Sequence, residues 1–242
     1  MPAISRRASE LGTENAFVVL AEVSALQRQG KDIISFCIGQ PDFPTPKNVC
    51  EAGIKAINEG KHGYTPSAGI LELREAAAKY LKRTRHIDIH ADDVVVGAGA
   101  KPFIAYAIVS TTDHGVGDEV IYPVPGFPIY ESQIKAMGAV PVPIYLRESR
   151  NFSFNPAELE ARITSKTKLL ILNSPQNPTG GIIPKKDVEV IAAILRKHPH
   201  VWVFADEIYS QLCYDGEFCS LTQFPGMIER TIICDGASKT WA

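Results

Sequence analysis

The sequence LILNSPQNPTGG, residues 170–181, passes from an apolar run into a turn crowded with Asn, Pro and Gly. An apolar run bounded by turn residues is typical of a buried strand. Pro175 and Pro178 lack an amide donor and restrict the residues before them, and the two glycines that follow allow conformations closed to other residues. Open α/β sheets bind ligands at the carboxyl ends of their strands, so Asn177 is a candidate ligand contact. An ordinary Asn-Pro turn explains the same residues.

Two further apolar runs downstream end in residues that carry chemistry. VWVFAD, residues 201–206, ends in the carboxylate of Asp206, and TIICD, residues 231–235, is followed by GASKTWA with Lys239. An amide, a carboxylate and an amine therefore each follow a predicted buried strand. If the strands are parallel neighbours, the three groups converge at one edge of the sheet.

Through NSPQNPTG, DEIY and SKT, in this order and spacing, the chain resembles the fold-type I pyridoxal-phosphate enzymes, and most closely the class I aminotransferases. The resemblance implies a pyridoxal 5'-phosphate cofactor and the transfer of an amino group between an L-amino acid and a 2-oxo acid. Lys239 would bond to the cofactor aldehyde and carry the substrate's α-proton. Asp206 would keep the ring nitrogen protonated, although a helix cap before EIYSQL is an alternative role for it.

The same resemblance implies roles for further residues. Tyr209 and Asn177 would bond to the phenolic oxygen, and Phe127 would stack on the ring. The turn at residues 97–101 and Ser238 would hold the phosphate at a helix N-terminus, while Tyr64 would reach the phosphate of a partner subunit. Taken singly, these residues also fit ordinary turns and packed loops. The predicted cofactor contacts are Gly99, Ala100, Lys101, Phe127, Asn177, Asp206, Tyr209, Ser238 and Tyr64, and the predicted substrate contacts are Gly39 and Asn177.

Composition is that of an ordinary globular protein. The 242 residues are 45% hydrophobic and carry a net charge of −2, so nothing indicates nucleic-acid binding, and no apolar run approaches the roughly 20 residues of a membrane helix. Five cysteines without a C-x-x-C pair favour a reduced, cytoplasmic setting, and the six histidines lack metal-ligand spacing. The first residues do not form a secretory signal.

Alternating strand and helix patterns predict an α/β protein, a three-layer sandwich with a mostly parallel sheet. We expect residues 1–45 to form an N-terminal helix or arm with part of a small domain, and residues 46–242 to form the cofactor-binding large domain, incomplete at its C-terminal end. Strands are expected at 33–38, 94–100, 118–123, 140–146, 170–173, 201–206 and 231–235. Helices are expected at 14–29, 46–58, 73–81, 101–110, 127–135, 156–163 and 185–197, with apolar faces turned inward on 46–58, 73–81 and 185–197.

Family members continue beyond the lysine with a phosphate-binding arginine, another strand and a small domain that binds the substrate carboxylate. We therefore expect this chain to be a fragment or a truncated paralogue, with little or no activity alone, and the intact protein to be a homodimer. β-Elimination, C–S lysis, decarboxylation and a non-catalytic role remain alternatives. The identity of the amino acid and oxo acid is left open.

Overall fold

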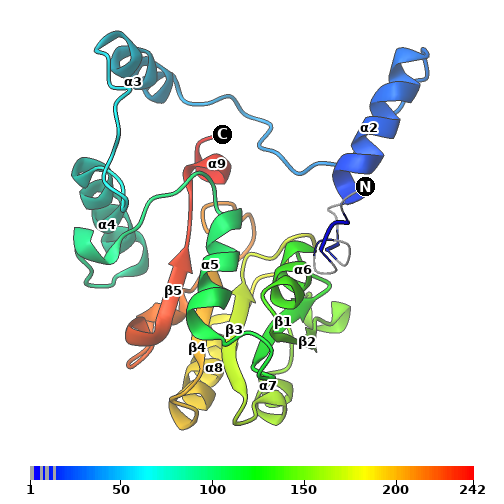
Figure 1. The fold of residues 1–242 in the computed structure, drawn as a ribbon, viewed down its shortest axis with the longest axis vertical. Coiled ribbons are helices and arrows are strands. Elements are labelled where there is room, and N and C mark those ends of the chain that lie inside the picture. Colours follow the sequence, from blue (N-terminus) through cyan, green and yellow to red (C-terminus); the bar gives the residue numbers. More distant parts are fainter. Residues whose placement is uncertain (1–2, 6–7, 9–10, 13–14) are drawn as a thin grey trace.

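The computed structural model describes residues 3–5, 8, 11–12 and 15–242 and centres on one parallel sheet (Figure 1). The strand order is β2-β1-β3-β4-β5, so the connection after β2 crosses back over β1. Asn173 of β3 lies opposite Asp206 of β4, which lies opposite Cys234 of β5. The carboxyl ends of these three strands are therefore level with one another. The strands are β1 (Glu119–Val124), β2 (Val140–Tyr145), β3 (Thr167–Asn173), β4 (Trp202–Asp206) and β5 (Thr231–Cys234).

Helices cover both faces of the sheet and make it the middle of three layers. One core cluster joins the sheet to α5 (Lys101–Thr111) and α6 (Ile129–Ala136), and the other joins it to α7 (Pro156–Arg162) and α8 (Lys185–Lys197). The predicted α/β sandwich with a parallel sheet is thus confirmed.

Local sequence explains where α7 and α8 form. The side chain of Asn155 accepts a hydrogen bond from the amide of Ala157 at 3.1 Å, which caps α7. In α8, the bounds match the prediction, and the residues expected to face inward are all buried. The alternation of apolar and polar residues at helical spacing is enough to orient this helix. These inward residues are Val188, Ile191, Ala192 and Leu195.

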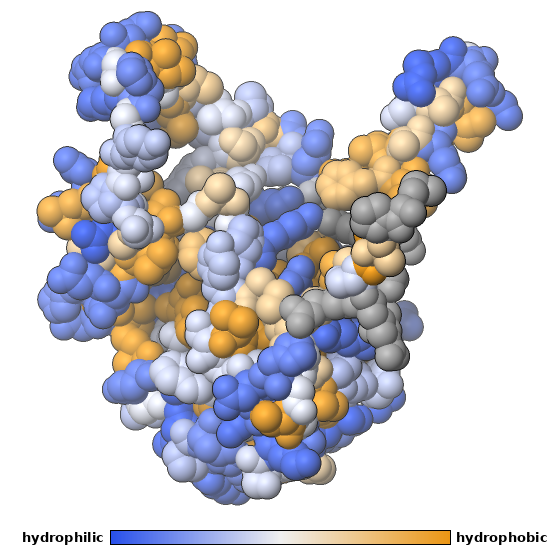
Figure 2. Space-filling view, viewed as in Figure 1, coloured by the Kyte–Doolittle hydropathy of each residue, from blue (hydrophilic) through white to orange (hydrophobic). Residues whose placement is uncertain are grey.

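In the described part of the chain, the helices α2 (Asn15–Arg28), α3 (Lys47–Asn58) and α4 (Leu71–Arg85) come before α5 and the sheet. Figure 1 shows α2 and α3 projecting away from the sheet, and Figure 2 shows hydrophobic side chains on their surfaces. All three helices were predicted, although residue 14 lies outside the described part. The inward face predicted for 46–58 is wrong, since α3 buries no residue. The inward face predicted for 73–81 is correct only in part, since Leu73 is exposed whereas Ala77, Tyr80 and Leu81 are half-buried. Amphipathic spacing predicts which face of a helix can be buried, but it does not show whether another element packs against that face.

Two predicted strands, 33–38 and 94–100, are wrong, because the structure assigns neither segment to a strand. β5 ends the sheet and pairs with β4, so the apolar run before Gly97 has no ladder partner among the described strands. Val95 is 61% exposed, and the amide of Val96 bonds to the carbonyl of Ala68 instead. A strand needs a neighbour for its backbone groups, which β-propensity alone cannot provide.

Candidate functional site

The turn after β3 is tied to the end of β4. The side chain of Asn173 donates to the carbonyl oxygen of Asp206 at 3.0 Å and accepts from the amide of Asn177 at 2.8 Å. Asn173 is buried, so its bond to Asp206 is shielded from water and its bond to Asn177 is partly shielded. The last residue of the strand thereby fixes where Asn177 stands relative to Asp206.

Asn177, Tyr209 and Lys239 form a connected row. The side-chain Nδ2 of Asn177 donates to the Tyr209 hydroxyl at 3.2 Å, and the Lys239 ammonium lies 5.7 Å from the centroid of the Tyr209 ring. Lys239 belongs to the four-residue helix α9 (Ala237–Thr240), and it also donates to the carbonyl oxygen of Gly39 at 2.9 Å. The loop at Gly39 therefore reaches the lysine, and it does so through its carbonyl group. The family resemblance implies a different contact, from the backbone amide of Gly39 to the substrate, and that contact stays a prediction.

Asp206 is 6% exposed at the end of β4. Its Oδ2 accepts a hydrogen bond of 2.6 Å from the hydroxyl of Tyr130, and the amide of Ile208 donates to Oδ1 at 3.4 Å. Burial raises the pKa of Asp206, although these two hydrogen bonds oppose the shift. A buried carboxylate that has only neutral donors is suited to a cationic partner, because the cation would balance a negative charge that water does not solvate.

Phe127 and Lys101 stand on the α5–α6 side of Asp206. The ring of Phe127 meets the ring of Tyr130 edge to face, with 5.7 Å between centroids. The Lys101 ammonium lies 5.5 Å from the Phe127 centroid and 5.4 Å from that of Phe17. Lys101 begins α5, and Gly99 before it has φ +86°, a left-handed conformation that glycine adopts without strain. The predicted turn at the N-terminus of a helix is therefore present.

The remaining predicted residues are more peripheral. Ala100 lies in the same turn as Gly99, and Ser238 is exposed on α9 next to the lysine. Tyr64 is fully exposed. No contact within the described residues joins Tyr64 to Lys239, so the chain by itself does not bring this tyrosine to the site.

Sequence reasoning missed two buried residues. Tyr130 follows Phe127 by three positions, a spacing that places two side chains on one helical face, and this signal could have identified it. Arg85, the last residue of α4, is fully buried among Glu207, Ser210 and Asp235. No pattern in the neighbouring residues predicts partners this far away in the sequence. Burial would lower the pKa of Arg85, but the carboxylates of Glu207 and Asp235 hold the value above its ordinary range. Arg85 therefore stays charged.

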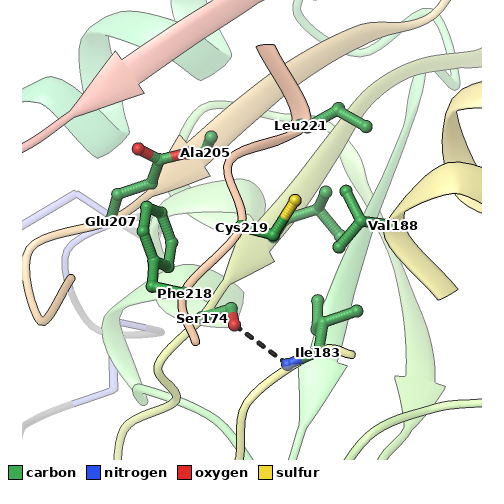
Figure 3. Close-up of a pocket in the computed structure, with 9 residues that line it drawn as sticks. Ser174, Ile183, Val188, Ala205, Glu207, Phe218, Cys219 and Leu221 are labelled. Carbon is green, nitrogen blue, oxygen red and sulfur yellow. Dashed lines mark hydrogen bonds between the residues drawn. The ribbon is translucent and has the colours of Figure 1, made fainter. Parts of the chain in front are cut away.

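Two cavities lie near these groups. The smaller, about 20 Å³, lies behind Glu207 and has room for roughly one water molecule. Figure 3 shows its largely apolar lining, including Phe218 and Cys219, with the hydroxyl of Ser174 accepting from the amide of Ile183. The larger, about 320 Å³, has the size of a small-molecule pocket. It is lined by Pro175, Gln176, Gly180, Ile182, Tyr209, Leu212, Tyr214 and Asp215.

Comparison with known proteins agrees with this geometry. Residues 31–242 match the family model described as aminotransferase class I and II. The chain is 37% identical over 240 residues to a bifunctional aspartate aminotransferase and glutamate/aspartate-prephenate aminotransferase of Petunia hybrida, covering 99% of this chain and 50% of the relative. It is 38% identical over 245 residues to the asparagine–oxo-acid transaminase of Streptococcus mutans, covering 100% and 62%.

Among solved structures, the aspartate aminotransferase of Thermus thermophilus with maleate superposes with a TM-score of 0.94 at 34% identity. The match covers 100% of this chain and 62% of that one. The chain thus spans about half to three fifths of the length of the relatives that it matches.

Proposed function

Because the chain belongs to the class I and II aminotransferases, we propose that it binds pyridoxal 5'-phosphate and serves in the transfer of an amino group between an L-amino acid and a 2-oxo acid. The observation that carries the proposal is the row Lys239–Tyr209–Asn177, which stands beside the buried Asp206 where three parallel strands end level. An amine, a carboxylate and two neutral donors are the chemistry that this cofactor requires.

Lys239 is the residue assigned to the cofactor aldehyde. When bound, pyridoxal phosphate supplies an electron sink that makes the α-proton of an amino acid removable. The amine of Lys239 would hold the aldehyde covalently, with loss of water, and, once the substrate's amino group had replaced it, would be free to accept and return that proton. In the present structure the Gly39 carbonyl holds this amine close to Tyr209, so the group is already oriented toward the row.

Asp206 and the Tyr209–Asn177 pair would hold opposite sides of the ring. A carboxylate near the ring nitrogen favours the protonated, cationic form, which would satisfy the charge of the buried Asp206. The Tyr209 hydroxyl and the Asn177 amide orient each other at 3.2 Å, and either can donate to the ring's phenolic oxygen. The α5 N-terminus, with its turn at residues 97–101, would attract the phosphate.

The names of the relatives guide the choice of substrates. They name aspartate, glutamate, prephenate and asparagine as the compounds on which those enzymes act. We propose dicarboxylic amino acids and their amides as the first amino donors to test, with 2-oxo acids as acceptors. We also propose that the working protein is a cytoplasmic homodimer. The fully exposed Tyr64 supports the dimer part of this proposal.

The test is to titrate the chain with pyridoxal phosphate, follow the visible absorbance, reduce with borohydride and map the labelled peptide. We expect the label on Lys239 and its loss in Lys239→Ala. Lys197→Ala is the control, because this lysine pairs with Glu160 on the surface. A label that falls on another lysine, such as Lys101, would overturn the assignment.

Amino-group transfer is then assayed with aspartate, glutamate or asparagine and a 2-oxo acid. Formation of a new amino acid supports transamination. Release of ammonia with a 2-oxo acid, or of carbon dioxide with an amine, would instead indicate elimination or decarboxylation on the same cofactor. Cofactor attachment is measured separately from turnover. Labelling of Lys239 therefore tests the cofactor site even if the chain transfers amino groups slowly.

A further inference from the structure

One guanidinium group joins the two strand ends that carry the predicted catalytic groups. Arg85 is fully buried, and its Nε donates to Oε2 of Glu207 at 3.0 Å. Its Nη2 donates to Oδ2 of Asp235 at 2.6 Å and to Oγ of Ser210 at 2.7 Å. The rings of Tyr80 and Phe218 lie 5.6 and 5.1 Å from its Cζ. The arginine is thus held from several sides in one geometry.

Both carboxylates lie close to site residues along the chain. Glu207 directly follows Asp206, and its second oxygen accepts from Ser220 at 2.6 Å, so the carboxylate is fully engaged. Asp235 is followed by Gly236, whose amide donates to Oδ1 of Asp235 at 2.7 Å at the start of α9. Arg85 therefore fixes the segment after β4 and the segment before Lys239 to one rigid group.

The helix that carries Lys239 depends on such contacts. A helix of four residues has no stability of its own, because nucleation costs more than its few hydrogen bonds return. After the lysine, Trp241 packs edge to face on Tyr80 of α4, with 5.6 Å between ring centroids. α4 thus touches the chain on both sides of Lys239, through Arg85 before it and through Tyr80 after it, and Figure 1 places α4 beside β5 and α9.

We propose that Arg85 is a positioning residue, which fixes the separation between Asp206 and Lys239 by holding the chain segments that follow β4 and β5. Its role toward the cofactor rests on the proposed function, whereas its role in seating α9 does not. Charge alone does not explain the arrangement, since a buried ion cluster commonly stabilises a fold no better than apolar side chains of the same size. What the guanidinium adds is a planar fork that reaches two segments at once.

The first experiment needs no cofactor. The chain has two tryptophans, so Trp202→Phe leaves Trp241 as the single tryptophan, and its emission reports on α9. In this background we expect Arg85→Met to shift the Trp241 emission to longer wavelength and to increase quenching by acrylamide. Arg85→Lys should restore part of the emission wavelength and part of the protection from quenching, because an ammonium keeps the charge but lacks the planar, two-pronged guanidinium. Arg147→Met is the control, since its guanidinium pairs with Glu158 on the surface.

Arg85→Met alone leaves two buried carboxylates without their cation and can prevent folding. The variant Arg85→Met/Glu207→Gln/Asp235→Asn removes all three charges and decides the question in a folded chain, as verified by circular dichroism. We expect this variant to keep its secondary structure, to loosen Trp241, and to slow the borohydride-trapped labelling of Lys239 by about 10- to 100-fold, the effect of a displacement near 1 Å.

Wild-type Trp241 emission together with wild-type labelling in the folded triple variant would overturn the proposal. If pyridoxal phosphate does not label Lys239 in the unchanged chain, the proposed function fails, and the Trp241 measurement still decides whether Arg85 seats α9.

Discussion

The hydroxyl of Tyr130 lies 2.6 Å from Oδ2 of Asp206, and both side chains are buried. Burial, with the neighbouring Asp206 charge, raises the pKa of Tyr130 well above its usual value, so the phenol remains a donor. The carboxylate is therefore held by a neutral group from α6, which orients it without cancelling its charge. That arrangement leaves Asp206 able to balance a cation placed beside it.

Tyr130→Phe should lower the free energy of unfolding and weaken the hold on Asp206. A hydrogen bond to a charged group contributes about 1.5–3 kcal/mol, so we expect a loss of that order in urea titrations. Because this bond lowers the pKa of Asp206, its removal raises that pKa further. Tyr106→Phe, on the exposed side of α5, is the control. Equal stabilities of the two variants would contradict the role given to Tyr130.

The acid side of the pH profile should carry the signature of the buried carboxyls. Burial raises the pKa of Asp206, Glu207 and Asp235, so above the ordinary value of about 4 the folded state binds more protons than the unfolded state. Stability from these groups is therefore present below that value and falls as pH rises through the folded pKa values.

Asp235→Asn removes one of these groups and should make that fall less steep, as measured by urea unfolding at a series of pH values. Asp88→Asn is the matched control. A hydrogen bond and the charge of Lys82 lower the pKa of this exposed carboxyl, so its contribution to stability rises with pH. Removing Asp88 should therefore not make the fall in stability with pH less steep. A profile that Asp235→Asn leaves unchanged would mean that Asp235 titrates as it does in the unfolded chain.

Adjacent positions of α8 test the packing of the core. Ile191 is fully buried against the sheet, whereas Val190 is 46% exposed. Ile191→Ala should cost about 2–5 kcal/mol in unfolding free energy, because it removes buried methyl groups and leaves a cavity. Val190→Ala should change stability by no more than about 0.5 kcal/mol. Similar losses at the two positions would place the inward face of this helix elsewhere.

The dimer proposal makes a prediction about mixed subunits. If Tyr64 serves the partner's site, combining Tyr64→Phe chains with Lys239→Ala chains yields a heterodimer with one site free of both changes. Pyridoxal phosphate should bind that site normally, and bind Tyr64→Phe homodimers roughly 10- to 100-fold more weakly, the loss of one bond to a charged phosphate. Tyr145→Phe, an exposed tyrosine on β2, is the control. Absorbance titrations that show no recovery on mixing would exclude a shared site.

The elements that could be predicted from the sequence are those determined by short runs of neighbouring residues. The apolar runs before Asn177, Asp206 and Lys239 fold as β3, β4 and β5, because each combines buried-strand composition with a turn that ends it. The α8 stripe specified its own inward face. The strand expected at 94–100 failed for a different reason: its partner had to come from elsewhere, and β-propensity does not say whether a neighbour exists.

The same limit applies to Arg85. An arginine in the last turn of a helix is usually interpreted as a charge that favours the helix dipole, and α4 has three basic residues there. Only the fold shows that one of them points into a buried cluster. Tyr130 is intermediate, since its spacing from Phe127 was visible, but its bond to Asp206 depends on how α6 packs on the sheet.

The distance along the chain between Arg85 and its partners sets an order for folding. Glu207, Ser210 and Asp235 lie 122, 125 and 150 residues further on. Closing such long loops costs entropy before any contact repays it, so we expect these bonds to form after β4 and β5 have joined the sheet. If the arginine were buried before the carboxylates, or the carboxylates before the arginine, a charge would be buried without its partner. We therefore expect α4 to dock in one concerted step, in which the helix that bears Lys239 also reaches its final place.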